Sequence, residues 1–291
     1  MEGLQRMLDS LEYIERNLDN NLLIEDIAYI ACMSKFHFQR MFNMLTGYTV
    51  SEYIRNRRIT VAAQELINSN SKVIDVAFKY GYESPESFTK AFRKIQGISP
   101  SEAKKNSQFL KAYPKLSFQI QLKGDVEMDY KIVEKSAFNV VGKSIRTTTI
   151  GGENNRRIDA FWVESNQNGL VSELAKNCGP LGLIGVCMDY DKQHENLTYL
   201  IGVEKNIEHI PSNWEERQIP SATWAVFPVH GAMPDAMPKV WDRIFSEWFP
   251  STGYEHAGGP EIEVYPSNAD PSSEDYYSEI WIPINKRQQD I

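Results

Sequence analysis

Three side chains near the start of the chain have the types and spacing that could read the edges of DNA bases. Phe36, Gln39 and Arg40 stand at positions i, i+3 and i+4, so a helix beginning near Ser34 places all three on one face. An arginine fork can bond a guanine edge at two points, and a glutamine amide can do the same for adenine. A solvated helix face would have the same spacing, so both interpretations stay open for Gln39 and Arg40.

A second group of candidate side chains, near the other end of the chain, combines carboxylates with aromatic rings. Strand alternation puts Glu263 and Tyr265 on one face of a predicted strand. Glu279 and Trp281 share a face of a later strand in the same way. If these two strands are neighbours, both carboxylates lie among aromatic rings, where a bulky organic cation would neutralise them and stack on the rings. The alternatives are a surface position or an internal salt bridge.

Three tryptophans are further candidates for the walls of such a cation site. Trp162, Trp224 and Trp241 all lie in the acidic part of the chain. Aromatic residues at helical spacing more often belong to a core than to a binding site. Both interpretations therefore stay open for each ring.

An enzymatic reading of the same residues is weaker. The five histidines are scattered, and the sequence has no His-Glu-x-x-His run, no Gly-x-Ser-x-Gly motif and no phosphate-binding loop. Glu263 and Glu279 could still act as an acid–base pair. A hydrolase is therefore kept as an alternative.

The elements that must position the first group follow a pattern that occurs twice. Each copy has a short apolar helix ending in alanine, a tight turn, and a second helix that mixes polar and basic residues, and the copies lie about fifty residues apart. This pattern is typical of two helix-turn-helix units in an all-α domain. We predict helices at residues 2–18, 24–31, 35–45, 49–68, 73–79, 84–96 and 100–105.

Positive charge is concentrated around these units. The whole chain has a net charge of −8. Residues 34–111 contain 13 Lys and Arg against 6 Asp and Glu, a balance of +7, whereas residues 114–291 contain 16 against 26, a balance of −10. Contact with phosphates requires such a basic region. The acidic remainder must have another task.

From Tyr130 the periodicity changes from helical to strand-like. It predicts an α+β domain with an antiparallel sheet, built from a duplicated strand–helix–strand–strand unit. We expect an all-α domain at 1–108, a connector at 109–129 and the sheet domain at 130–288. The elements predicted for the sheet domain are strands at 131–149, 181–189, 197–204, 217–229, 260–266 and 276–284, with helices at 155–165 and 235–248.

Composition excludes several classes of protein. The chain has 42% apolar and 24% charged residues, as folded domains do, and no apolar run long enough to cross a membrane. Its N-terminus has no signal-peptide core, so we expect a cytoplasmic protein without membrane contact. Cys32, Cys178 and Cys187 lack metal-ligand spacing, and we predict neither a metal nor a cofactor.

The first 105 residues resemble the DNA-binding domain of AraC/XylS transcriptional regulators. The resemblance rests on SKFHFQRMF at 34–42, YIRNRR at 53–58, VAFKYGYES at 76–84 and GISP at 97–100. It implies that the first recognition helix faces DNA, with Phe36 in place of a more common tryptophan, and that the second unit mainly grips the backbone. The implied DNA-contacting residues are Lys35, Phe36, Gln39, Arg40, Glu86, Ser87, Lys90, Arg93 and Lys94.

The second half resembles GyrI-like effector-binding domains. The matching residues are 248–250, 253–254, 260–265 and 279–284, and the order of domains is similar to the Rob-type arrangement. Related domains use a glutamate at the position of Glu263 for lipophilic cations, so the resemblance implies a cation site there. The implied ligand-binding residues are Glu263, Tyr265, Glu279, Trp281, Trp241 and Trp162.

Together these features predict a sequence-specific DNA-binding regulator, and we expect an activator. Its partners would be promoter DNA, RNA polymerase and a small aromatic or cationic effector. The alternatives are a GyrI-like hydrolase fused to a DNA-binding domain, or a module that sequesters toxic compounds while binding DNA without specificity.

Overall fold

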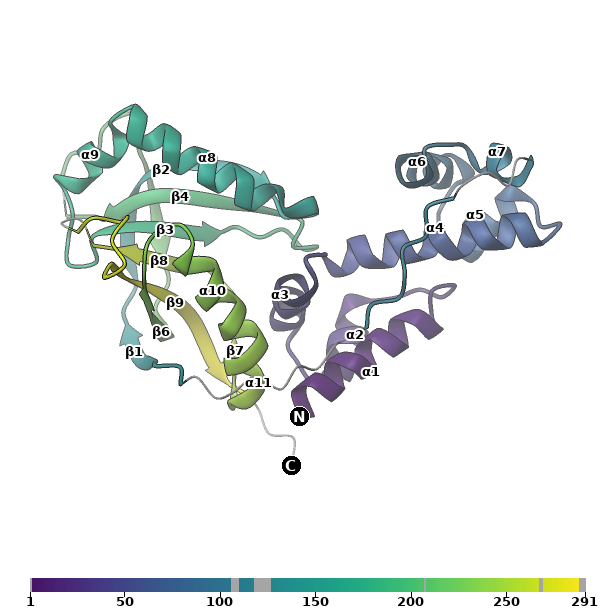
Figure 1. The fold of residues 1–291 in the computed structure, drawn as a ribbon, viewed down its shortest axis with the longest axis horizontal. Coiled ribbons are helices and arrows are strands. Elements are labelled where there is room, and N and C mark those ends of the chain that lie inside the picture. The colour runs from purple at the N-terminus through teal and green to yellow at the C-terminus, as the bar shows by residue number, and fades with distance from the viewer. Residues whose placement is uncertain (1, 106–109, 118–126, 207, 267–268, 288–291) are drawn as a thin grey trace. The chain divides into compact units, whose positions relative to one another are not determined.

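The part of the chain before residue 106 is folded into helices joined by short turns (Figure 1). Every predicted helix is present, and the boundaries agree with the predicted ranges to within two residues. The helices are α1 (Glu2–Arg16), α2 (Ile24–Ile30), α3 (Lys35–Thr46), α4 (Val50–Asn68), α5 (Val73–Lys79), α6 (Pro85–Gln96) and α7 (Pro100–Lys105).

Helix α6 shows why these boundaries can be predicted. The side chain of Ser84 accepts a hydrogen bond from the backbone N–H of Ser87, and Pro85 occupies the first helical position. At the other end, Gly97 adopts a left-handed conformation with φ of 81°. Both ends of α6 are therefore set by residues next to them in the sequence.

The computed structural model describes residues 2–105, 110–117, 127–206, 208–266 and 269–287. The chain divides into two compact units. Unit 1 comprises residues 1–35 and 50–123, and unit 2 comprises residues 36–49 and 124–291. Helix α3 thus groups with the sheet domain, apart from the helices that flank it in sequence. The predicted domain boundaries stay a prediction.

The first part of the predicted connector is packed against unit 1. Gln96 exchanges two hydrogen bonds with the backbone of Lys111, and the backbone N–H of Tyr113 donates to Thr60. Residues 118–126 of the connector lie outside the described residues.

Within the described residues, unit 2 is built on an antiparallel sheet with the strand order β1-β6-β9-β8-β3-β4-β2-β5, and β7 pairs with β9. The predicted antiparallel sheet is confirmed. The strands are β1 (Lys131–Lys135), β2 (Phe138–Thr148), β3 (Leu183–Met188), β4 (Asn196–Glu204), β5 (Glu215–Ile219), β6 (Ala222–His230), β7 (Tyr254–His256), β8 (Glu261–Tyr265) and β9 (Tyr277–Lys286).

Two of the predicted strands are wrong, because each range contains two strands instead of one. The range 131–149 divides into β1, which pairs with β6, and β2, which pairs with β4 and β5. The range 217–229 divides in the same way into β5 and β6. Each break lets one continuous β-rich segment supply strands to different parts of the sheet.

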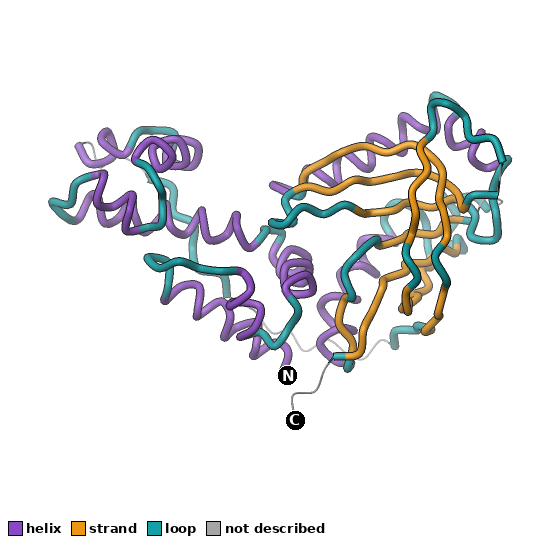
Figure 2. The backbone as a smooth tube through the Cα atoms, turned by 180° about the vertical axis from the view of Figure 1, so that it is seen from behind, coloured by secondary structure: helices purple, strands orange, loops and turns teal. Residues whose placement is uncertain are grey.

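The sheet is strongly curved (Figure 2). One core cluster contains residues from strands at both ends of the strand order, including Val133 of β1 and Ile219 of β5, so the sheet bends around it. The opposite face is covered by α8 (Glu153–Gln167) and by α9 (Leu170–Ala175), a helix that was not predicted. The predicted helix 235–248 is α10 (Ala236–Arg243) followed by a π-helical turn (Ile244–Trp248) and α11 (Phe249–Ser251).

The two halves of the sheet have the same pairing order. In the first half β3 pairs with β4 and β4 with β2, and in the second β8 pairs with β9 and β9 with β6. The halves meet where β3 pairs with β8. That this symmetry reflects a duplicated unit stays a prediction. Among the described helices, none has the length and apolar character needed to cross a membrane.

Candidate functional site

Glu263 is the centre of a cluster of neutral hydrogen-bond donors in unit 2. The indole Nε1 of Trp241 donates to its Oε1 at 2.9 Å. The hydroxyls of Tyr199 and Tyr265 both donate to its Oε2, each at 2.9 Å. The indole of Trp162 donates to the Tyr199 hydroxyl at 2.9 Å and packs edge-on against Tyr265, with ring centroids 5.2 Å apart. Four aromatic side chains therefore surround one carboxylate.

This surrounding changes the acidity of Glu263. Burial raises the pKa of the carboxyl group, and the hydrogen bonds from Trp241, Tyr199 and Tyr265 offset that rise only in part. Among the described residues, no lysine or arginine forms an ion pair with this carboxylate. A cation that reached Glu263 would therefore supply the charge that the site lacks.

Two members of this cluster were missed from the sequence, Tyr199 and Gly185. Gly185 pairs with Glu263 across β3 and β8, and a Cβ at this position would lie 2.1 Å from the Tyr199 hydroxyl oxygen and 3.1 Å from Glu263 Oε2. Only glycine leaves room for this hydrogen bond. A glycine inside a strand is the sequence signal that could have indicated such a close approach.

The prediction that Glu263 and Glu279 share one site is wrong. Strands β8 and β9 are neighbours, but Glu263 pairs with Ile280, and Glu279 pairs with Val264. Because paired residues share a face, the two carboxylates lie on opposite faces of the sheet. The pair that would support a hydrolase is therefore not formed.

Glu279 and Trp281 form a separate, internally paired group. The Glu279 carboxylate accepts hydrogen bonds from the Trp281 indole at 2.8 Å and the Tyr277 hydroxyl at 2.6 Å, and it pairs with Lys131 at 2.9 Å. Trp281 also packs in the core beside Trp224, with ring centroids 6.1 Å apart. Both tryptophans are therefore core residues. A core position was one of the two interpretations that the sequence left open for Trp224.

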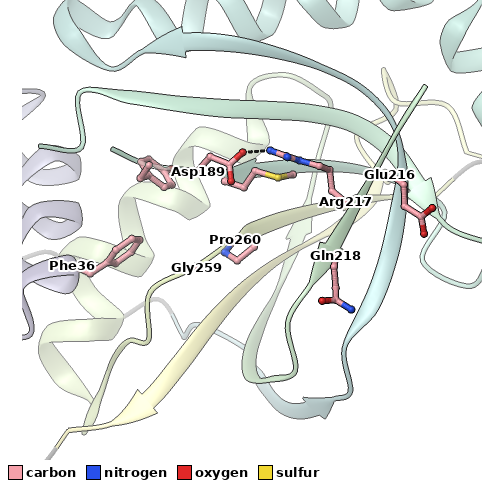
Figure 3. Close-up of a pocket in the computed structure, with 9 residues that line it drawn as sticks. Phe36, Asp189, Glu216, Arg217, Gln218, Gly259 and Pro260 are labelled. Carbon is pink, nitrogen blue, oxygen red and sulfur yellow. Dashed lines mark hydrogen bonds and ion pairs between the residues drawn. The ribbon is translucent and has the colours of Figure 1, made fainter. Parts of the chain in front are cut away.

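An open cavity of about 450 Å³ lies elsewhere in unit 2, and Figure 3 shows its walls. Its charges are already paired: Asp189 with Arg217, and Glu216 with Lys205. Glu263 is not among the lining residues. We therefore take the cluster around Glu263, and not this cavity, as the candidate ligand site. The cavity is lined by Phe36, Met188, Asp189, Tyr190, Glu216, Arg217, Gln218, Gly259 and Pro260.

The exposed face of α6 in unit 1 has the character expected of a DNA-backbone contact. The apolar side chains Phe88 and Phe92 are fully buried, which turns the polar side of the helix to solvent. A shallow groove on this side includes Pro85 and Thr89. All five residues predicted for this contact are exposed: Glu86, Ser87, Lys90, Arg93 and Lys94.

Two arginines of α4 make contacts that stabilise unit 1. Arg57 pairs with Glu15 at 2.8 Å and donates to the backbone oxygen of Tyr113. Arg58 donates to the backbone oxygens of Leu18 and Asn20 at 2.8 and 2.6 Å. These two arginines stabilise unit 1 through contacts with other parts of the chain, which their place in the basic region 34–111 did not indicate. Lys35, predicted for DNA contact, pairs with Glu25 at 2.7 Å on the surface.

The predicted base-reading face of α3 is packed inside unit 2. The Arg40 guanidinium makes two hydrogen bonds to the Glu261 carboxylate, at 2.6 and 2.7 Å. Gln39 donates to the backbone oxygen of Lys192 at 3.1 Å. The ring of Phe36 lies 4.5 Å from the ring of His194. Contact with DNA through these side chains therefore requires α3 to leave this position.

Glu261 and Glu263 point to the same face of β8 but differ in charge environment. Burial alone would raise the pKa of Glu261, yet the charge of Arg40 and the hydrogen bonds from His256 and Arg40 lower it to about 2. Strand alternation puts Glu261 on the face of Glu263, but nothing in the sequence indicates its arginine partner. One strand thus presents a fully paired carboxylate beside one that has only neutral donors.

Comparison with known proteins gives one match in each half of the chain. Residues 131–284 match the family model described as integron-associated effector binding protein, and residues 27–106 match a helix-turn-helix domain model. The chain therefore belongs to the AraC family of transcriptional regulators and carries a GyrI-like, integron-associated effector-binding domain at its C-terminal side.

Curated relatives match the helix-turn-helix part of the chain. The chain is 48% identical over 91 residues to the HTH-type transcriptional activator AarP of Providencia stuartii, covering 31% of this chain and 67% of AarP. It is 38% identical over 90 residues to the multiple antibiotic resistance protein MarA of Escherichia coli, covering 31% of this chain and 71% of MarA. Among solved structures, SAV2435 bound to tetraphenylphosphonium aligns with a TM-score of 0.49 and 22% identity, covering 54% of this chain and 94% of that chain.

Proposed function

We propose that this regulator activates transcription and that an aromatic organic cation, bound at Glu263, is its effector. The DNA contacts would come from α3 and α6, and RNA polymerase would be the protein partner at the promoter. AarP, the relative that is 48% identical in the DNA-binding part, is named as a transcriptional activator. No bond-breaking step is part of this proposal.

The observation that carries the effector proposal is the Glu263 carboxylate. It is partly buried, its pKa is raised by burial, and its hydrogen bonds come from the neutral groups of Trp241, Tyr199 and Tyr265. A delocalised aromatic cation would satisfy the charge and stack on the surrounding rings. A hydrated inorganic cation has no aromatic surface that could stack on these rings.

Tetraphenylphosphonium binding to the full chain tests this proposal. We expect the wild type to bind this cation and to reject tetraphenylborate, which has nearly the same shape and the opposite charge. Glu263→Gln should weaken binding of the cation at least about tenfold, because it removes a charge–charge interaction in a poorly solvated site. Titration calorimetry measures both affinities.

Glu279→Gln is the matched control, because it makes the same change on the opposite face of the sheet. It should leave the affinity for tetraphenylphosphonium unchanged. Equal weakening by both substitutions, or equal binding of the cation and the borate, would show that Glu263 is not the recognition group.

The DNA proposal predicts distinct effects of single lysines. Duplexes should first be selected from a random-sequence pool with the full chain. Lys90→Ala should then weaken binding and reduce the slope of log affinity against log salt by about 0.9, because one phosphate contact is lost. Lys176→Ala, on the surface of unit 2, should change neither quantity. If selection enriches no sequence, binding is non-specific and the sequestration alternative gains support.

A further inference from the structure

Helix α3 is held in unit 2 by contacts along the same face that was predicted to read DNA. Phe36 lies between the rings of His194 and His256, at 4.5 and 4.7 Å. His37 accepts a hydrogen bond from the backbone of His256 at 3.2 Å. With the bonds of Arg40, these contacts cover the first two turns of α3.

Among these residues, Arg40 pairs with a buried carboxylate and also lies among three aromatic rings. Its guanidinium carbon lies 5.8, 5.5 and 5.3 Å from the ring centres of Tyr190, Trp241 and Phe245. Arg40 is 9% exposed and Glu261 is 1% exposed. The Tyr190 hydroxyl also donates to Glu261 at 3.1 Å. We call Glu261, Tyr190, Trp241 and Phe245 the guanidinium site.

The guanidinium site and a guanine base would use the same atoms of Arg40. Two parallel N–H groups bond either a carboxylate or the O6 and N7 edge of guanine, and they cannot bond both at once. We propose that the guanidinium site is an autoinhibitory site that competes with DNA for Arg40 and keeps the first recognition helix away from DNA.

The guanidinium site adjoins the proposed effector site, and this part of the inference rests on the proposed function. Trp241 belongs to both: its indole N–H bonds Glu263, and its ring lies against Arg40. Glu261 and Glu263 stand two residues apart on one face of β8. A cation bound at Glu263 would therefore repel the nearby charge of Arg40 and compete for the Trp241 ring. Effector binding and release of α3 would favour each other.

Hydrogen–deuterium exchange of the full chain tests the autoinhibitory site without any DNA. Glu261→Gln leaves Arg40 buried without an opposite charge, so we expect the amides of residues 36–46 to exchange roughly tenfold faster or more. Affinity for a selected duplex should rise by a similar factor, because more molecules are competent to bind. Glu216→Gln, which alters an exposed carboxylate of unit 2, should change neither.

Two further measurements keep the test decisive. Exchange in β8 shows whether Glu261→Gln disturbs the sheet itself. If it does, Tyr190→Phe, which removes one bond to Glu261 and keeps the ring, should still speed exchange of residues 36–46 severalfold. Unchanged exchange of α3 in a variant with an intact sheet overturns the autoinhibitory site.

Amide exchange measured with and without tetraphenylphosphonium tests the autoinhibitory site and the proposed effector separately. Tetraphenylphosphonium should speed exchange of residues 36–46 in the wild type and have no such effect in Glu263→Gln. If the cation does not bind but Glu261→Gln releases α3, the proposed effector is wrong and the autoinhibitory site stands. If the cation binds at Glu263 while Glu261→Gln leaves α3 protected, the proposed effector stands and the autoinhibitory site is wrong.

Discussion

Arg40→Met should lower the free energy of unfolding of unit 2 by about 3–5 kcal/mol, because it leaves the Glu261 carboxylate buried without its partner. Glu261 is 1% exposed, and its low pKa depends on the charge of Arg40. His256 and Tyr190 remain as hydrogen-bond donors, but neither replaces a permanent charge. Urea unfolding measures the loss.

Tryptophan fluorescence makes this measurement specific to unit 2. The six tryptophans of the chain all fall within residues 124–291, so the signal reports the sheet domain alone. If α3 leaves the domain in the variant, Glu261 becomes hydrated and the loss is limited to the energy of docking α3. Exchange of residues 36–46 then identifies that outcome.

The double variant Arg40→Met with Glu261→Met is the informative companion. Removing both charges leaves no unpaired charge, so the part of the loss that comes from the buried carboxylate should return, while the hydrogen bonds from His256 and Tyr190 stay lost. Lys205→Met, which breaks a more exposed ion pair with Glu216, should lose less than about 1 kcal/mol. If the double variant is as unstable as the single one, packing of Arg40 matters and its charge does not.

The contrast between α6 and α3 shows what a local pattern can establish. Ser84, Pro85 and Gly97 set the ends of α6, and its exposed polar face follows from the buried spacing of its apolar residues. The spacing of Phe36, Gln39 and Arg40 likewise placed them on one helix face. Their contacts, however, are with residues more than 150 positions away, and periodicity carries no information about such partners.

In the sheet, alternation within one strand could likewise be predicted from the sequence, whereas the pairing between strands could not. Alternation correctly put Glu263 and Tyr265 on one face, and it correctly put Glu279 and Trp281 on one face. Which faces coincide depends on the register between β8 and β9, where a shift of one residue exchanges the two faces. The predicted shared site is wrong because alternation within each strand does not give the register between the two strands.

The tryptophans fall on two different faces of the sheet, and the sequence could not show which ring lies on which face. Trp162 and Trp241 reach the Glu263 cluster because α8 and α10 cover the face to which Glu263 points. Trp224 and Trp281 point to the other face and fill the core there. The spacing left a core position and a ligand site open for Trp162, Trp224 and Trp241, because only the layer arrangement decides which side of the sheet each ring meets.

Acidification should destabilise unit 2 between about pH 6.5 and 4, because histidines that are buried next to α3 are neutral in the folded state. Burial lowers the pKa of His37 and His256, and burial together with the charge of Arg40 lowers the pKa of His194 to about 4. In the unfolded state these groups titrate near 6.5. Below that pH the unfolded state binds more protons than the folded state, so stability falls as the pH falls.

The size of this effect can be stated for His194, which is 6% exposed. At pH 5 it alone should cost about 2 kcal/mol relative to pH 7, from a separation of about 1.5 pH units at 1.36 kcal/mol each. Glu261 adds little at pH 5, because the unfolded carboxyl takes up protons mainly near and below its ordinary pKa of about 4.3. Nearer pH 4 it adds to the loss, because its low folded pKa keeps the folded carboxylate charged while the unfolded one is protonated. Glu263 opposes the trend, since its raised pKa favours the folded state as the pH falls.

Urea unfolding followed by tryptophan fluorescence at pH 7.5 and at pH 5 measures this dependence. His194→Asn should reduce the pH dependence by about 2 kcal/mol, because it removes the titrating group. Because His37, His194 and His256 all lie where α3 packs, acid should also lower the protection of the amides of residues 36–46, measured relative to their intrinsic exchange rates at each pH, before the domain unfolds. A pH dependence that is identical in wild type and His194→Asn would mean that this histidine is already charged, or already hydrated, in the folded protein.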